Sequence, residues 1–231
     1  MKPGKRVLPL YALTNYWMLN HMRSIASIIL LFIAASVAAQ PSGFKKLDDL
    51  QTFRTAMSAS SAKLQNITSD FRQVKNLSLL AEKINSKGKF YFMKDDKVRI
   101  EYTEPYSYLM VMNGTRMLVK DEQKTNKINT GNSKMMQSVN RVMVDCMSGT
   151  VMSNPDFKVT VYKSSKQYLL SMVPVSPEMK NLFSQIEVYI SQAALDVEKL
   201  VMTESGGDYT SMDFYNTKHN TPVNEALFKV K

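Results

Sequence analysis

The residues best suited to nucleophilic chemistry are one thiol and one imidazole, far apart in the chain. Cys146 is the single cysteine, and His219 is the second of two histidines, because His21 lies in an N-terminal segment with the features of a leader. A Cys–His dyad would need both side chains in a polar cleft, within hydrogen-bond reach of each other. Cys146 stands instead among apolar residues at helical spacing, which favours a small buried thiol. We therefore predict no catalytic residue and expect that the protein is not an enzyme.

Acidic side chains that could bind a metal are scattered through predicted turns. They are Asp95, Asp96, Asp121, Glu122 and Asp156, and Asp is favoured in turns because its carboxylate accepts bonds from nearby backbone N–H groups. The sequence contains no His and Cys set with metal-site spacing, and neither a GxSxG motif, an HExxH motif nor a P-loop. We expect no metal and no cofactor.

Methionine is the residue type that departs most from ordinary composition, with 17 in the chain. Those that fall in the predicted sheet or the second predicted helix are Met93, Met110, Met112, Met117, Met135, Met136, Met143, Met147 and Met172. Met side chains are flexible and polarizable, so they suit a surface that repacks around ligands of varied shape. Composition leaves two interpretations open: such a ligand surface, or a loosely packed core.

The N-terminal segment has the composition of an export leader. Residues 24–39 (SIASIILLFIAASVAA) form an apolar run that follows Arg23 and ends in small residues, as at a signal peptidase site. We predict a leader at residues 1–39, with a cleavable signal peptide at 22–39, and a single domain at 40–231. The alternative is an uncleaved anchor helix. The signal predicts a protein that works outside the cytoplasm.

Net charge helps to exclude one class of partner. Loss of residues 1–39 would remove four basic residues and no acidic one, so the net charge would fall from +10 to +6. The remaining Lys and Arg residues are spread along predicted strands and turns, without basic blocks or interleaved aromatic residues. We therefore predict no nucleic-acid partner.

The elements that would position these residues are many strands and two amphipathic helices. Apolar stripes at helical spacing predict helices over 43–65 and 132–149. Period-2 alternation predicts four strands between Phe71 and Gly114, with turns at Lys94–Lys97 and Asn113–Gly114. Further strands are predicted at 115–120, 124–129, 157–163, 167–173, 185–191, 197–204 and 209–215, with a helical turn at 176–183 and a helical turn plus a last strand at 221–230.

This pattern predicts an α+β protein dominated by one large antiparallel sheet. An open sheet of ten or eleven strands curls because each strand twists. The two helices would then cover the opening or fill the interior. A curved sheet lined by Met, Phe and Ile under amphipathic helices would enclose a hydrophobic cavity.

Four short segments resemble a known family. Residues 69–73 (SDFRQ), 88–92 (GKFYF), 98–105 (VRIEYTEP) and 111–114 (VMNG) are similar to the N-terminal half of the LolA family of periplasmic outer-membrane lipoprotein carriers, which includes LolA-like and LolB-like proteins. The family shows a Ser-x-Phe-x-Gln strand, a Gly-led strand, an aromatic strand that ends in Pro, and a turn ending in Asp-Gly or Asn-Gly. The match in layout extends over most of the chain after residue 40.

The resemblance implies an unclosed half-barrel with lid helices over a cavity that takes up lipoprotein acyl chains. It implies two partners: an inner-membrane ATP-driven extraction complex that supplies the cargo, and an outer-membrane acceptor that receives it. In the family, an arginine after the second strand latches the lid. Here the matching positions hold Lys94 and Asp95, so Lys94 becomes the candidate lid latch, with a point charge in place of the arginine fork.

On this hypothesis we expect a monomeric periplasmic carrier. The residues expected to line the cavity are Phe90, Phe92, Val98, Ile100, Tyr102 and Met110 from the sheet, and Met136, Val139 and Met143 from the second helix. Two other hypotheses stay open. The same fold could be an envelope-stress or lipid-sensing module. A lipid or cell-wall hydrolase would need His219 or Cys146 in a polar cleft.

Overall fold

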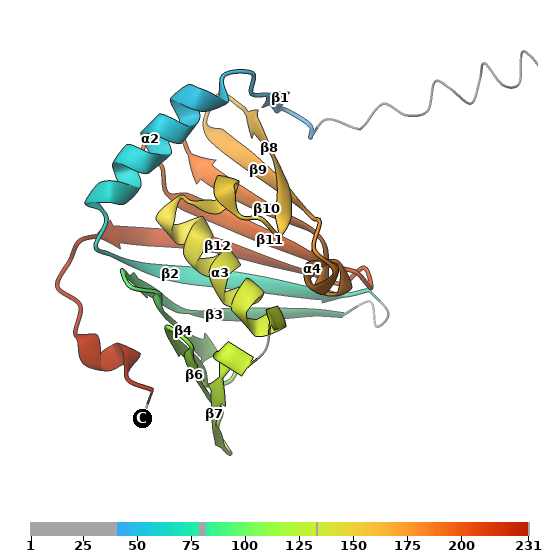
Figure 1. Cartoon of the computed structure of the whole chain (residues 1–231). Helices are drawn as coiled ribbons and strands as arrows, with labels where there is room; N and C mark the ends of the chain where they lie inside the picture. The colour runs from blue at the N-terminus through green and yellow to red at the C-terminus, as the bar shows by residue number, and fades with distance from the viewer. Residues whose placement is uncertain (1–40, 79–81, 133, 231) are drawn as a thin grey trace, which may run out of the picture. The chain divides into compact units, whose positions relative to one another are not determined.

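The computed structural model describes residues 41–78, 82–132 and 134–230 (Figure 1). Ser42–Lys231 form one compact unit. The predicted leader at 1–39 and its signal peptide lie outside the described residues, so both stay predictions. Within the described part, no helix combines the length and the apolar character that a membrane crossing requires.

The described chain is dominated by twelve strands. They are β1 (Lys45–Lys46), β2 (Asn66–Leu77), β3 (Glu82–Met93), β4 (Lys97–Glu104), β5 (Tyr108–Asn113), β6 (Arg116–Lys120), β7 (Thr125–Asn129), β8 (Phe157–Lys163), β9 (Gln167–Pro174), β10 (Phe183–Ser191), β11 (Val197–Glu204) and β12 (Tyr209–His219). The helices are α2 (Leu50–Lys63), α3 (Lys134–Ser148) and α4 (Pro177–Leu182), and the 3-10 turns are η1 (Thr130–Asn132), η2 (Val151–Ser153) and η3 (Glu225–Phe228).

All strands belong to one antiparallel sheet, in the order β1-β8-β9-β10-β11-β12-β2-β3-β4-β5-β6-β7. The sheet consists of two runs of sequential hairpins, β2 to β7 and β8 to β12, which are joined where β12 pairs with β2. Its two edges, β1 and β7, are not paired with each other, so the sheet is an unclosed one. The predicted α+β class and unclosed antiparallel sheet are confirmed.

Local turn chemistry fixes the register of the hairpins. Three residues, 94 to 96, connect β3 to β4, and two of them, Asp95 and Asp96, adopt positive φ angles of 65° and 56°, which Asp tolerates better than most residues. Gly114, with φ of 57°, turns β5 into β6. The predicted turns at Lys94–Lys97 and Asn113–Gly114 therefore lie where the sequence pattern places them.

The first helix is shorter than predicted. Asp49 is its N-cap, with a carboxylate that accepts bonds of 3.0 Å from the N–H groups of Gln51 and Thr52. Because this cap ends the preceding extended segment, the helix begins at Leu50, and Lys45 and Lys46 form β1 beside β8. The apolar stripe from residue 43 onward therefore mixes a strand with a helix, and its first part was wrongly predicted as helical.

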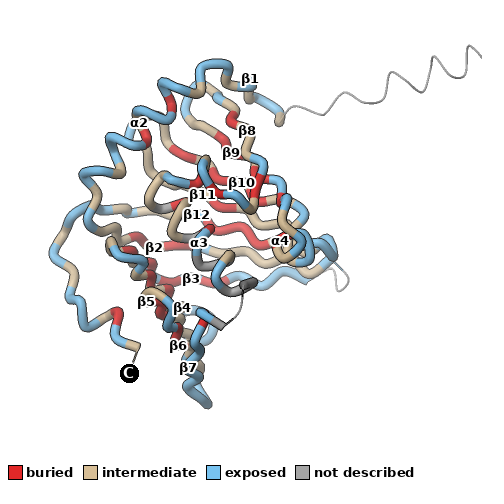
Figure 2. The backbone as a smooth tube through the Cα atoms, viewed as in Figure 1, coloured by how far each residue is buried: buried red, intermediate tan, exposed pale blue. Residues whose placement is uncertain are grey.

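The main core lies between one face of the sheet and the helices α2 and α3, which cross that face (Figures 1 and 2). Phe53 and Met57 from α2, and Val142 and Cys146 from α3, belong to the same buried cluster as the sheet residues. We call this side of the sheet the inner face. The predicted cover of amphipathic helices is therefore present.

The C-terminal tail packs on the opposite, outer face. Phe228 in η3 is 1% exposed and forms a second buried cluster with Val111 and Leu118. The tail was predicted to end in a strand, and this is wrong. The strands beneath the tail already pair on both sides, so no free edge is left for it. Its carbonyls accept bonds from side chains instead, from Arg99 to Leu227 at 3.1 Å and from Asn113 to Phe228 at 3.1 Å.

Candidate functional site

The inner face of the sheet places apolar side chains from adjacent strands side by side. Phe90 on β3 pairs with Ile100 on β4, which pairs with Met110 on β5. In a strand alternate residues share a face, so Gly88, Phe92, Val98 and Tyr102 lie on the same face as these three. This register gives the site one continuous wall from the first run of hairpins.

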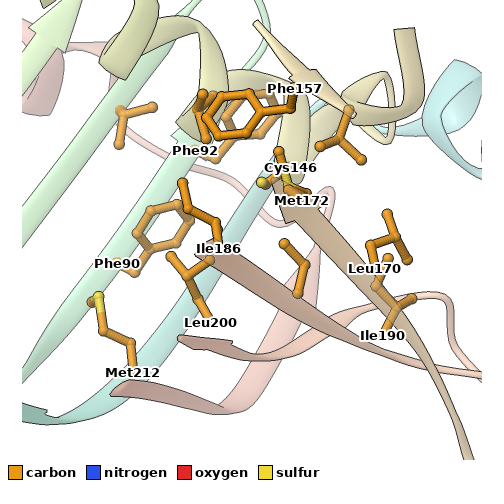
Figure 3. Close-up of a cluster of buried hydrophobic side chains, with 14 of the residues drawn as sticks. Phe90, Phe92, Cys146, Phe157, Leu170, Met172, Ile186, Ile190, Leu200 and Met212 are labelled. Carbon is orange, nitrogen blue, oxygen red and sulfur yellow. The ribbon is translucent and has the colours of Figure 1, made fainter. Parts of the chain in front are cut away.

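A partly open cavity of about 200 Å³ lies between this wall and the second run of hairpins. Its lining from the second run is Phe183, Ile186, Leu200, Met202, Met212 and Phe214. Its lining from the first run is Gln73, Phe90, Ile100, Tyr102 and Met110, and α3 supplies Val142 and Cys146. Figure 3 shows Phe90, Ile186, Leu200 and Met212 converging from different strands. The volume is below the roughly 300–1,000 Å³ of most ligand sites.

The structure divides the residues predicted to line the cavity into three groups. Phe90, Ile100, Tyr102 and Met110 line it. Phe92 and Val98 are buried at 2% and 0% exposure in the same cluster, but outside the cavity wall. The side chains of Met136, Val139 and Met143 lie outside the described part of the chain, and their predicted role stays a prediction.

Sequence reasoning missed most of the second half of the wall. The alternation of Ile186 with polar neighbours in β10, and of Leu200 and Met202 in β11, carried the signal. Gln73 was also missed, although it closes the Ser-x-Phe-x-Gln segment. A polar residue in an alternating strand usually indicates the solvent side, so pattern alone assigned it no place in an apolar site.

Two polar side chains meet inside the cavity. The Tyr102 hydroxyl donates to Gln73 Oε1 at 2.8 Å. The Tyr102 ring makes edge contacts with Phe71 and Tyr108, at centroid distances of 5.1 and 5.6 Å. Burial raises the pKa of Tyr102 to about 12, with a further contribution from Tyr108 and an opposing one from the bond to Gln73. The phenol is therefore neutral and acts as a donor at physiological pH.

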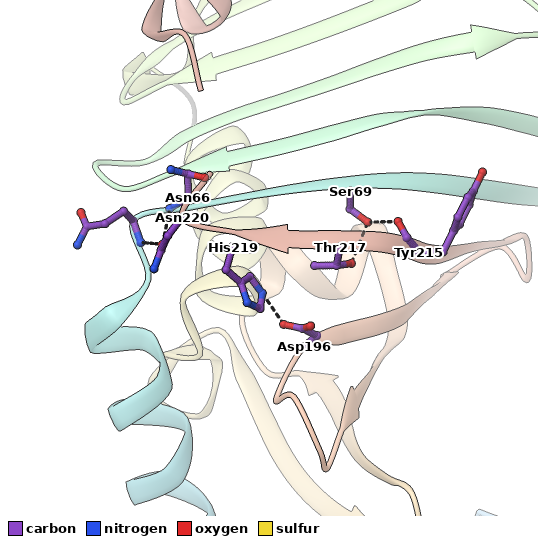
Figure 4. A network of polar contacts seen from close by, with 8 residues as sticks. Asn66, Ser69, Asp196, Tyr215, Thr217, His219 and Asn220 are labelled. Carbon is purple, nitrogen blue, oxygen red and sulfur yellow. Dashed lines mark hydrogen bonds and ion pairs between the residues drawn. The ribbon is translucent and has the colours of Figure 1, made fainter. Parts of the chain in front are cut away.

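Cys146 is a buried thiol within the core. It is 3% exposed, and burial raises the pKa of the thiol to about 12, with the Asp145 charge adding to the shift. A nucleophilic cysteine needs a thiolate stabilised by positive surroundings. His219 contacts a different partner, because its Nε2 lies 2.6 Å from Asp196 Oδ1 (Figure 4). Both residues line one cavity, but the raised pKa of the thiol and the pairing of His219 with Asp196 do not favour a Cys–His nucleophile.

A second, more polar cavity of about 330 Å³ lies at the C-terminal end of α2. Its walls include Met57 and Lys63 of α2, Asp196 just before β11, and His219 at the end of β12. Cys146 lines this cavity as well as the apolar one. The end of α3 that carries this thiol therefore separates the apolar cavity from a crevice beneath α2.

The end of α2 is held by the side chains of Asn220 and Lys94, which directly follow β12 and β3. Asn220 Nδ2 donates to the Lys63 carbonyl at 3.0 Å, and Asn220 Oδ1 accepts from Gln65 N at 2.7 Å. Lys94 Nζ donates to the Ala62 carbonyl at 3.3 Å. These bonds satisfy carbonyls that the last helical turn leaves without partners. The residue predicted as a lid latch thus contacts a lid helix.

Among the described residues, no group of three or more His, Cys, Asp or Glu side chains could hold a metal. Hydrogen bonds already occupy the carboxylates of Asp49, Asp121 and Asp208 and lower the pKa of each. Asp49 accepts from the Thr52 hydroxyl and from backbone N–H groups, Asp121 accepts from the N–H groups of Gln123 and Lys124, and Asp208 accepts from the N–H and hydroxyl of Ser78.

Comparison with protein families finds one match, to the family described as outer membrane lipoprotein carrier protein LolA, over residues 62–231. No curated protein matches. Among solved structures, a LolA superfamily protein from Nitrosomonas europaea is 8% identical, with a TM-score of 0.43 over 76% of this chain and 97% of that one.

Two further structures are similar at the same level. The lipoprotein LppX from Mycobacterium tuberculosis is 12% identical, with a TM-score of 0.41 over 77% of this chain and 99% of that one. The MucA/MucB complex from Pseudomonas aeruginosa gives 10% identity and a TM-score of 0.43, over 78% of this chain and 60% of that one.

Proposed function

This chain belongs to the LolA family of outer membrane lipoprotein carrier proteins, and from this premise we propose that it carries lipoproteins by binding their acyl chains in the apolar cavity under α3. The observation that carries the proposal is this cavity, whose lining among the described residues is apolar apart from Gln73, Tyr102 and the Cys146 thiol.

The physical need for such a carrier is large. Each methylene exposed to water costs about 0.8 kcal/mol, so a sixteen-carbon chain costs on the order of 10 kcal/mol to keep in solution. A carrier must cover this surface and still release it. Flexible Met110, Met202 and Met212 side chains in the wall suit acyl chains of differing length and path.

Uptake needs a displacement of the lid, because the closed cavity holds only part of a long chain. The few contacts that hold the end of α2, from Lys94 and Asn220, are exposed hydrogen bonds of modest strength. Such bonds can break and re-form with cargo. Lys94 would therefore act as a weak latch.

The proposal includes a route. A carrier of this family would work as a monomer in the periplasm, receive lipoproteins from an inner-membrane ATP-driven extraction complex, and deliver them to an outer-membrane acceptor. The export leader predicted at residues 1–39 is the sequence feature that supports this location.

The test is native mass spectrometry after co-expression with a triacylated lipoprotein. We expect wild-type protein to carry the lipoprotein, and Met202→Trp, which fills the cavity, to lose most of it. Val201→Trp is the matched control, because Val201 pairs with Ser211 on the outer face of the same strand. Circular dichroism confirms that each variant is folded. A wild-type protein that stays empty while a known carrier is loaded would overturn the proposal.

A further inference from the structure

Among the described residues that line the apolar cavity, Gln73 is the one amide side chain. Its strand, β2, lies at the joint between the two runs of hairpins, where Gln73 pairs with Met212 of β12. Tyr102 comes from β4, and β3 lies between the two. The pair therefore spans three strands to meet at the floor of the cavity.

Gly88 makes this meeting possible. It pairs with Phe71 on one side and with Tyr102 on the other, so it lies directly between β2 and β4 on the inner face. A Cβ atom here would lie 2.7 Å from the Phe71 ring and 2.1 Å from the Glu101 carbonyl oxygen. Because no side chain stands at this point, the Tyr102 ring can lean across β3 onto Phe71 and toward Gln73.

The bond to Tyr102 sets the orientation of the amide. Tyr102 donates to Gln73 Oε1. The carbonyl oxygen of the amide therefore has a partner, and the NH₂ group is left to donate to a ligand. In the described part of the chain, no acceptor pairs with this NH₂ group. The rigid ring of Tyr102, held by Phe71 and Tyr108, keeps the donor fixed in an otherwise apolar wall.

A fixed donor in an apolar site selects for ligands that bring an acceptor. A hydrocarbon or an alkyl ether chain leaves the N–H groups poorly paired once water is expelled, and an unpaired buried donor weakens binding. An ester or amide carbonyl accepts well. The Cys146 thiol is a weak donor and does not replace this function.

We propose that Gln73, oriented by Tyr102, binds the carbonyl oxygen of the acyl linkage and so makes the cavity selective for acyl chains over alkyl chains. This inference rests on the proposed function, since it requires that lipid chains enter the cavity. Gln73 is the binding residue, and Tyr102 is a positioning residue.

The test compares two lipids that differ only at this group: 1-palmitoyl-lysophosphatidylcholine, which has an ester carbonyl, and 1-O-hexadecyl-lysophosphatidylcholine, which has an ether. Affinities are measured below the micellar concentration, by displacement of a fluorescent apolar dye. We expect wild-type protein to bind the ester about tenfold more tightly, the effect of one well-made hydrogen bond.

Three variants identify the residues. Gln73→Met replaces the amide with an apolar side chain of similar length. It should abolish the preference for the ester and leave the affinity for the ether unchanged. Tyr102→Phe keeps the ring contacts and should reduce the preference, because the amide is free to turn. Gln185→Met is the matched control, since Gln185 donates to Ser171 at 3.0 Å away from the cavity, and it should keep the full preference.

The outcomes separate the two proposals. Equal binding of ester and ether by wild-type protein, or an unchanged preference in Gln73→Met, overturns the carbonyl site while the carrier proposal stands. Equal losses for both lipids in Gln73→Met indicate a packing role and also overturn the site. Absence of binding for both lipids, in protein shown to be folded, contradicts the carrier proposal itself.

Discussion

Gly88 stands at a point in β3 where the sheet has no room for a side chain. The nearest obstacle is the Glu101 carbonyl oxygen, 2.1 Å from the position of a Cβ atom. A backbone atom cannot move aside as the end of a side chain can. Close packing therefore explains why the segment 88–92 begins with glycine.

We predict that Gly88→Ala lowers the free energy of unfolding by about 3 kcal/mol or more, because overpacking at backbone costs at least as much as overpacking among side chains. Urea denaturation measures the change. Gly206→Ala is the control, since nothing lies within 4 Å of its Cβ position. Equal stability of the two variants would show that β3 and β4 can separate without cost.

Cys146 gives a prediction about alkaline pH. Burial raises the pKa of its thiol from an ordinary value of 9.0 to about 12. Between these values the unfolded chain releases the proton and the folded chain keeps it, so folding stability falls as pH rises.

Relative to Cys146→Ala, wild-type protein should lose up to about 1.4 kcal/mol of stability per pH unit across this window. Both proteins contain the same tyrosines, so their difference isolates the thiol. Urea denaturation at pH 8, 9, 10 and 11 checks this. Parallel stability profiles would mean that the thiol is not buried as described.

At the residue scale, periodicity predicted more about the sheet than about the site. Alternation put Phe90, Ile100 and Met110 on one face, and pairing between neighbouring strands follows from short turns. The place of Gln73 depends on a tyrosine two strands away and on the absence of a side chain at Gly88. No pattern within one strand contains that information.

At the scale of elements, the C-terminal end of α2 is the part of the lid with the clearest attachment. Asn220 has a φ of 52°, which glycine adopts without strain, so Asn220→Gly removes the side-chain bonds and keeps the backbone. We predict that Asn220→Gly and Lys94→Met each speed opening of the lid.

Thiol labelling measures this opening, because Cys146 is the only cysteine and is buried when the lid is closed. Maleimide labelling should be several-fold faster in both variants than in wild-type protein. Asn216→Gly is the control, since Asn216 also has positive φ, at 54°, but donates to Asp70. Faster labelling in the control as well would indicate general loosening of β12.

The tail η3 gives a prediction for the outer face. Phe228→Ala should lower stability by about 3–5 kcal/mol, as for other buried Phe residues, because Phe228 fills the cluster with Val111 and Leu118. Lipid affinity should be unchanged, since this cluster and the cavity lie on opposite faces. Lys229→Ala, exposed beside it, is the control. Loss of lipid binding in folded Phe228→Ala would show that the two faces are coupled.

Element types were easier to predict than element ends. The helix at 132–149 and most hairpins follow from hydrophobic spacing and turn residues. The start of α2 depends on which of Asp48 and Asp49 becomes the cap. The tail depends on whether a sheet edge is free, and this is a property of the assembled sheet.

At the scale of the molecule, the sequence predicts a large curved sheet but not its strand order. Neighbouring strands in sequence pair through short turns, so two meanders follow directly. The contact that unites them, β12 with β2, joins distant parts of the chain. Ser69 Oγ, for example, donates to the Tyr215 carbonyl at 2.9 Å across 146 residues (Figure 4).

The pairing of β12 with β2 determines when the cavity is completed during folding. Closing so long a loop is entropically costly and slow compared with forming a hairpin, so each meander can form before the two meet. The cavity draws Phe90 and Ile100 from one meander, and Leu200 and Met212 from the other. Neither meander alone supplies all of these walls, so on the proposed function acyl chains could bind only after β12 has docked on β2.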